Sequence, residues 1–129
     1  MEDSTTMDQL SRWVSGALEN ADLVTIGEYL DPAVHWGPPG DTSPPCQTKE
    51  QVLEWYKAGY EAAVRARVTE IVIGPDCLVV GLAVRGSREG RQHASESLRW
   101  QVLNVRNAKV VSIVGFDERA DAIAHAGVA

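Results

Sequence analysis

Three side chains in this 129-residue sequence could move or stabilise charge within one shared site: His35, Arg99 and Asp117. A histidine can accept or donate a proton near neutral pH, so His35 is the strongest candidate for a general acid or base. A buried arginine can stabilise a developing oxyanion, and a carboxylate beside it can orient that arginine or a water molecule. Together these residue types predict acid–base catalysis without a cofactor. The histidines lack the spacing of metal ligands, so no metal site is expected.

Each of the three candidates also has a purely structural interpretation. His35 could be a hydrogen-bonded residue of the core, and Arg99 could serve in a structural ion pair. Asp117 stands directly before the sequence ERADAIA, where it could cap the N-terminus of a final helix. The sequence leaves these alternatives open.

Strand alternation predicts which of these residues share a face. Side chains two positions apart in a strand point the same way, so Ser97 and Gln101 face the interior if Arg99 does. Asp117 shares that face on the neighbouring strand, where it is expected to pair with Arg99. The outward positions are apolar, which favours a sheet-to-sheet dimer interface over contact with water. They are Leu98, Trp100, Val102, Val114 and Phe116.

The elements that must position these residues are helices first and strands afterwards. Apolar residues at helical spacing predict helices over residues 5–20 and 23–30, and the second stops before Pro32. A short extended segment over residues 33–36 follows. A capping box of Thr48 and Gln51 starts the third helix.

From Arg65 onward the pattern changes to β-branched runs separated by turns, which predict four strands. The sequence RNAK over residues 106–109 predicts a hairpin turn. A terminal helix follows Asp117 and stops at Gly127. The order α-α-β-α-β-β-β-β-α predicts one α+β domain spanning residues 1–129, with a curling antiparallel sheet.

Composition narrows the class of partner. The chain has 18 acidic and 12 basic side chains, a net charge of −6, which argues against a nucleic-acid surface and against adhesion to anionic lipid. No apolar run approaches the roughly 20 residues of a membrane span. The polar start, MEDSTTMDQ, is unlike a secretory signal, so a cytoplasmic protein is expected. Cys46 and Cys77 are expected to be reduced thiols, with a disulfide between them as the alternative.

Three stretches carry a resemblance to a known family: NADLVTIGEYLDPAVHW, QTKEQVLEWYKAGY and KVVSIVGFDERADAIAHAG. With the order of elements, they resemble the nuclear-transport-factor-2-like superfamily, in particular its SnoaL-like polyketide cyclases and steroid delta-isomerases. The resemblance implies a cone-shaped α+β barrel whose curved antiparallel sheet wraps around the N-terminal helices. It also implies an apolar pocket inside the cone and a homodimer formed through the outer sheet face.

Carried over residue by residue, the steroid-isomerase pattern is mostly missing. Its general base, its oxyanion-hole tyrosine, its protonated aspartate and a pocket tryptophan fall on Gly37, Val14, Arg99 and Asp117 respectively. Two pocket tyrosines of that family have counterparts in Tyr29 and Tyr56. The resemblance also places the face of His35 inside the pocket. An isomerase of that mechanism is therefore not expected.

The sequence thus predicts a small-molecule pocket protein that acts on an apolar cyclic or polyketide-like substrate. Cyclisation, isomerisation, dehydration and epoxide opening all suit such a pocket, with His35, Arg99 and Asp117 as catalytic residues. The expected substrate-binding residues, some of which could instead be core, are Tyr29, Trp36, Trp55, Tyr56, Tyr60, Ser97 and Gln101. A non-catalytic binding or carrier protein is the alternative. A third possibility is a dimerisation module whose cone is filled by its own tryptophans.

Overall fold

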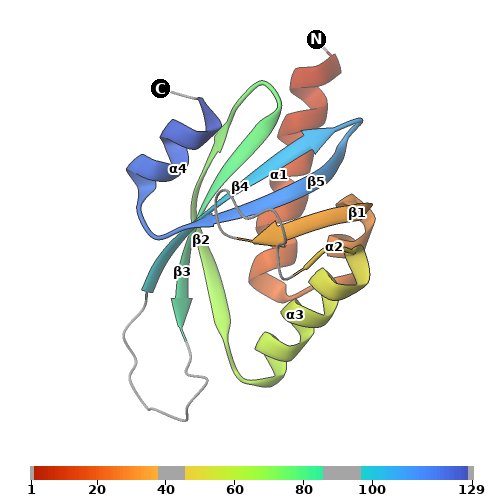
Figure 1. The fold of residues 1–129 in the computed structure, drawn as a ribbon, viewed down its shortest axis with the longest axis vertical. Coiled ribbons are helices and arrows are strands. Elements are labelled where there is room, and N and C mark those ends of the chain that lie inside the picture. Colours follow the sequence, from red (N-terminus) through yellow and green to blue (C-terminus); the bar gives the residue numbers. More distant parts are fainter. Residues whose placement is uncertain (1, 38–45, 86–96, 128–129) are drawn as a thin grey trace.

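The computed structural model describes residues 2–37, 46–85 and 97–127, and in these ranges it has the predicted order of elements (Figure 1). The helices and strands are α1 Glu2–Asn20, α2 Leu23–Tyr29, β1 Leu30–Gly37, α3 Lys49–Glu61, β2 Arg65–Ile73, β3 Cys77–Arg85, β4 Ser97–Arg106, β5 Lys109–Phe116 and α4 Arg119–Ala126. The α+β class is therefore confirmed. The predicted loops over residues 38–45 and 86–96 lie outside the described residues.

The five strands form one mixed sheet in the order β1-β5-β4-β3-β2. Neighbours from β2 to β5 are antiparallel, whereas β1 runs parallel to β5. Within the described ranges the sheet is open, with β1 and β2 at its edges, and the parallel β1 is the one departure from the expected antiparallel sheet. Hydrophobic alternation predicts which face of a strand is buried, but it contains no information on the direction of the neighbouring strand.

Local hydrogen bonds explain where the helices begin and end. The Thr48 side chain accepts a bond from the backbone N–H of Gln51, which confirms Thr48 as the predicted cap. The Gln51 side chain accepts a bond from the N–H of Gln47, one residue before the position that a capping box would use. Gly127 ends α4 with a left-handed backbone, at φ 73°, as expected of a C-cap glycine. Strand β1 begins at Leu30, three residues earlier than predicted.

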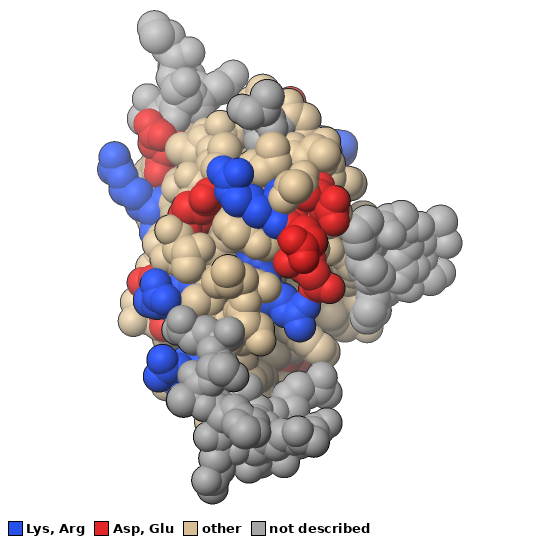
Figure 2. Space-filling model, turned by 90° about the vertical axis from the view of Figure 1, so that its left-hand side faces the viewer, with Lys and Arg blue, Asp and Glu red and all other residues tan. Residues whose placement is uncertain are grey.

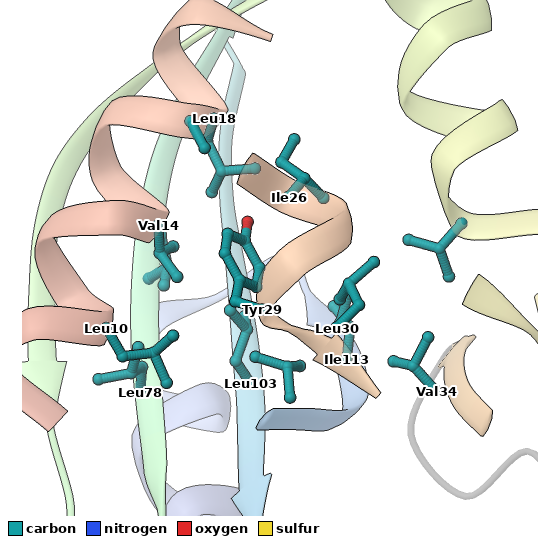
Figure 3. Close-up of a cluster of buried hydrophobic side chains, with 14 of the residues drawn as sticks. Leu10, Val14, Leu18, Ile26, Tyr29, Leu30, Val34, Leu78, Leu103 and Ile113 are labelled. Atoms are coloured by element: carbon teal, nitrogen blue, oxygen red, sulfur yellow. The ribbon is translucent and has the colours of Figure 1, made fainter. Parts of the chain in front are cut away.

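The inner face of the sheet packs against α1 and α2 to form the main core (Figure 3). Tyr29 stands among Val14, Leu18 and Ile26 in this core and is 3% exposed. Burial raises the pKa of Tyr29 well above its ordinary value, with a smaller contribution from the nearby Tyr56 hydroxyl. The fully buried members of the core include Leu10, Ile26, Leu30, Val34, Leu78, Val80, Leu103 and Ile113.

The outer face of the sheet has a second, smaller cluster beneath α4. Trp100 and Val102 point outward, as strand alternation predicts, but they pack against Ala122 of α4 within the same chain. The ring of Phe116 lies 5.2 Å from that of His125 on α4. A terminal helix therefore covers part of the face that the sequence assigned to a dimer, although Leu98 remains 57% exposed. The homodimer stays a prediction.

The surface on the α4 side carries charges of both signs. Figure 2 shows small groups of basic and acidic side chains interspersed there with uncharged residues. Among the described helices, none is long and apolar enough to cross a membrane.

Candidate ligand cavity

A cavity of about 730 Å³ lies between α3 and the sheet. This volume falls within the range of small-molecule sites, which span roughly 300–1,000 Å³. Its wall is mainly aliphatic and aromatic. It is formed by Leu18, Ala21, Ile26, Trp36, Trp55, Tyr56, Ala58, Gly59, Tyr60, Ala62, Val64, Ala66, Leu82, Val84, Arg99, Trp100, Gln101, Gly115, Phe116 and Asp117.

Aromatic rings from β1 and α3 meet at one side of the cavity. The Trp36 ring lies 5.8 Å from Trp55 in an edge-to-face arrangement and 5.0 Å from Tyr56. Tyr60, one helical turn further along α3, stacks under the guanidinium of Arg65 at 3.8 Å. Four of the aromatic residues predicted as substrate-binding therefore line one cavity. Such rings offer an apolar cyclic ligand broad contact surfaces.

Gln101 is the buried polar residue of the cavity wall, with 8% of its surface exposed. Its side-chain oxygen Oε1 has no hydrogen-bond partner among the described residues. An unpaired buried acceptor costs roughly 1–3 kcal/mol of stability, so such atoms are uncommon in folded proteins. The unpaired oxygen is therefore a feature that a bound molecule could explain.

Tyr56 lies beside Gln101 and keeps its proton. Burial raises the pKa of Tyr56 far above its ordinary value, a hydrogen bond from Gln101 lowers it in part, and the nearby Cys46 raises it slightly. The hydroxyl is therefore neutral at physiological pH. A neutral phenol can donate a hydrogen bond to a ligand, which a phenolate cannot.

Arg99 and Asp117 form a hydrogen-bonded ion pair at the rim of the cavity, which confirms the predicted pairing. The pair is not buried: the two side chains are 54% and 76% exposed. Asp117 was also predicted as a possible helix cap, and that was wrong. The residue before α4 is Glu118, whose side chain makes no capping bond. Asp117 lies one residue before the cap position, and its carboxylate pairs with Arg99 instead.

His35 does not face the cavity, and its predicted place inside the pocket was wrong. The side chain is exposed and belongs to the opposite face, in line with Ser112 of β5. Its neighbours Val34 and Trp36 point inward instead, and Val34 is fully buried. The cause is an irregularity of β1: the five steps from Leu30 to His35 correspond to only two steps of β5, from Val110 to Ser112. Extra residues of this kind change which side chains face inward.

Two further predicted binding residues lie away from the cavity wall. Tyr29 is enclosed in the core, and Ser97 is exposed at the start of β4. In contrast, no local pattern indicated the aliphatic part of the wall, which α1, α2 and β3 provide. Gly115 lies on the inward face of β5, as strand alternation predicts, and it opens space in the wall because a Cβ at this position would meet nothing within 4 Å.

A second, shallower apolar groove of about 480 Å³ runs along α3, next to Cys46. Burial raises the pKa of the Cys46 thiol, so the group stays protonated and is a poor nucleophile. The acidic residues of this groove, Glu50 and Glu54, are exposed to solvent. The larger cavity is therefore the better candidate site, because polar side chains of three elements converge on it.

No model of a protein family matches the sequence, and no curated protein matches it. Several solved structures are similar to this chain in fold. Bal32a, from a soil-derived mobile gene cassette, has a TM-score of 0.72 at 16% identity, covering 96% of this chain and 98% of its own. A protein of unknown function from Burkholderia pseudomallei, described as NTF2-like, has a TM-score of 0.69 at 19% identity, and the match covers 94% of this chain and 97% of the other.

A candidate polyketide cyclase from Sinorhizobium meliloti is similar at a TM-score of 0.65 and 18% identity, covering 86% of this chain and 98% of its own. The chain has the nuclear-transport-factor-2-like fold. The resemblance found in the sequence is thereby confirmed at the level of the fold. At these identities the likeness concerns the fold alone, and the activity has to be argued from the cavity.

Proposed function

We propose that this protein binds an apolar cyclic or polyketide-like small molecule in the cavity between α3 and the sheet. The observation that carries the proposal is the cavity itself, about 730 Å³ in volume, with an aromatic wall and an unpaired buried oxygen on Gln101. A domain with only a structural role would fill such a space, because protein interiors are close-packed. The cavity also argues against a module filled by its own tryptophans.

Similar structures support the chemical class of the ligand. One of them is a candidate polyketide cyclase, and another is a candidate ketosteroid isomerase from Kribbella flavida. The first name refers to ring formation on a polyketide, and the second to a steroid ketone. The wall of Trp36, Trp55 and Tyr56 suits a molecule of that kind.

A cavity-blocking variant tests this proposal. Gly115→Leu should fill the cavity without a backbone clash, because space beyond the α-carbon is open. Gly16→Leu is the matched control, since Gly16 on α1 is also open but lies outside the cavity wall. The measurement is a thermal-shift screen against steroids, aromatic polyketides and epoxides.

A ligand at about 100 times its dissociation constant should stabilise the wild type by roughly 2.7 kcal/mol, a rise of several degrees in Tm. The control should keep this rise and Gly115→Leu should lose it. The proposal is wrong if no compound shifts the wild type, or if Gly115→Leu responds as the wild type does.

The ion pair at the rim favours a second candidate function, cofactor-independent acid–base catalysis in the same cavity. Asp117 would take a proton from a C–H group next to a carbonyl of the ligand, and Arg99 would stabilise the oxygen anion of the resulting enolate. Return of the proton to another carbon gives an isomer, with no electron acceptor needed. Cyclisation, dehydration or epoxide opening would use the same pair. His35 takes no part, because it faces away.

Exchange of ligand protons separates an enzyme from a carrier. In deuterium oxide, an enzyme with Asp117 as base should introduce deuterium into a bound ketone, as followed by NMR. Asp117→Asn should abolish this exchange and leave binding within a few-fold of the wild type. Glu118→Gln removes the adjacent carboxylate and serves as the control. If no bound ligand exchanges its protons for deuterium, the result supports a carrier and contradicts the catalytic function.

A further inference from the structure

Some polar groups that face the cavity have a hydrogen-bond partner within the protein, and one has none. Arg99 and Asp117 bond to each other at the rim. Gln101, which is more than nine-tenths buried, has its oxygen Oε1 without a donor among the described residues. A buried acceptor of this kind needs a donor, and the cavity is the space from which one can come.

The contact with Tyr56 determines which atom of the Gln101 amide is free. Although burial raises the pKa of Tyr56, the hydrogen bond with Gln101 acts in the opposite direction and lowers it. Because Oε1 of Gln101 has no partner, the amide nitrogen makes this bond and its N–H donates to the Tyr56 oxygen. The amide nitrogen is therefore engaged, and Oε1 remains.

The cross-strand neighbours of Gln101 leave this oxygen accessible. Gly115 is its partner on β5, and a Cβ there would meet nothing within 4 Å. Val80 is its partner on β3 and has an apolar side chain. Neither neighbour can donate from a side chain, whereas the missing side chain of Gly115 leaves room for a ligand atom.

We propose that the cavity selects neutral ligands that carry a hydroxyl or N–H group, which donates a hydrogen bond to Oε1 of Gln101. This inference rests on the proposed function, because it names the ligand class of the same cavity. A phenol or cyclic alcohol fits both the aromatic wall and the free acceptor. A ketone, ester or ether whose polar atoms only accept leaves Oε1 unpaired and binds more weakly, because sites built to pair a hydroxyl discriminate against analogues that lack it.

The test compares two probes that differ in one donor, 2-naphthol and 2-methoxynaphthalene, by calorimetric titration of the purified chain. The wild type should bind the naphthol at least about tenfold more tightly than its methyl ether. Gln101→Met keeps the length of the side chain and removes the acceptor, so the two probes should then bind equally. Gly16→Leu, outside the cavity, should keep the wild-type ratio.

A second variant covers the case in which Gln101→Met does not fold. Tyr56→Phe releases the amide N–H, which can then donate to the ether, so the preference for the naphthol should shrink. Equal binding of both probes to the wild type, abolished by Gly115→Leu, would overturn the inference and leave the proposed function intact. A preference that persists in Gln101→Met would also overturn it. If neither probe nor any screened compound binds, both proposals fall.

Discussion

The indole ring of Trp100 on β4 lies against the bare backbone of Gly81 on β3. The two residues are cross-strand partners, and a Cβ on Gly81 would lie 2.8 Å from Cη2 of Trp100 and 2.6 Å from Oγ1 of Thr69. Both distances are too short for van der Waals contact. Gly81 thus makes room for the tryptophan that supports α4 on the outer face of the sheet.

Gly81→Ala should therefore destabilise the fold. The added methyl group forces Trp100 or Thr69 to move, and overpacking of this kind typically costs about 1–3 kcal/mol. Urea titration followed by tryptophan fluorescence measures the change in the free energy of unfolding. Gly115→Ala is the matched control, because its Cβ enters open space in the same sheet. Equal effects of the two substitutions would contradict this account of Trp100.

The order of elements could be predicted from the sequence because it depends on local signals. The change from helical to alternating apolar spacing near Arg65, the Thr48 cap and Gly127 each act within a few residues. The parallel placement of β1 beside β5 could not be predicted in this way. It joins segments about 80 residues apart, and no local pattern records the direction of such a neighbour.

The site could be predicted only where the strands are regular. Arg99, Gln101 and Asp117 lie as alternation along β4 and β5 places them, and all three reach the cavity wall. The prediction for His35 is wrong because β1 is irregular before this residue, so the resemblance placed the wrong face of the strand inward. A single extra residue exchanges the two faces of a strand, which makes irregular strands the weakest point of any such prediction.

The hairpin between β4 and β5 contains a position that glycine should improve. Asn107 and Ala108 both have positive φ, at 54° and 65°, as in the tight turn that suits twisted strands. Alanine is strained there, because the left-handed conformation costs a residue with a Cβ roughly 1–2 kcal/mol. Ala108→Gly should therefore raise the free energy of unfolding by about 1 kcal/mol.

Differential scanning calorimetry should show the stabilisation by Ala108→Gly as a rise of a few degrees in Tm. Ala124→Gly, at an exposed position of α4, is the control and should lower Tm, because glycine weakens a helix. A decrease in Tm on Ala108→Gly would contradict the strained turn.

Alkaline conditions should destabilise the protein through its buried tyrosines. Burial raises the pKa of Tyr56 and of Tyr29 above the ordinary value of about 10. The folded chain then keeps protons that the unfolded chain releases, so the free energy of unfolding falls as pH rises above about 10 and is unaffected by these groups well below it.

Urea titrations at a series of pH values across this range measure the slope. Tyr56→Phe should flatten it, because this substitution removes one of the two hydroxyl groups whose pKa is raised. A slope that is unchanged in Tyr56→Phe would show that this hydroxyl titrates as freely in the folded chain as in the unfolded one.

The Arg99–Asp117 pair should contribute little to stability, whatever its role in the cavity. Its side chains are 54% and 76% exposed, and ion pairs in contact with water are worth about 0–1 kcal/mol. A double-mutant cycle of Arg99→Gln and Asp117→Asn measures the coupling between them. The coupling should lie below about 1 kcal/mol and should shrink further in 1 M salt, where charges are screened within about 3 Å. A coupling well above this would mean that the pair is shielded from water and serves the fold. A small coupling would show that the pair adds little to the fold, which is compatible with a role in ligand binding or proton transfer at the cavity rim.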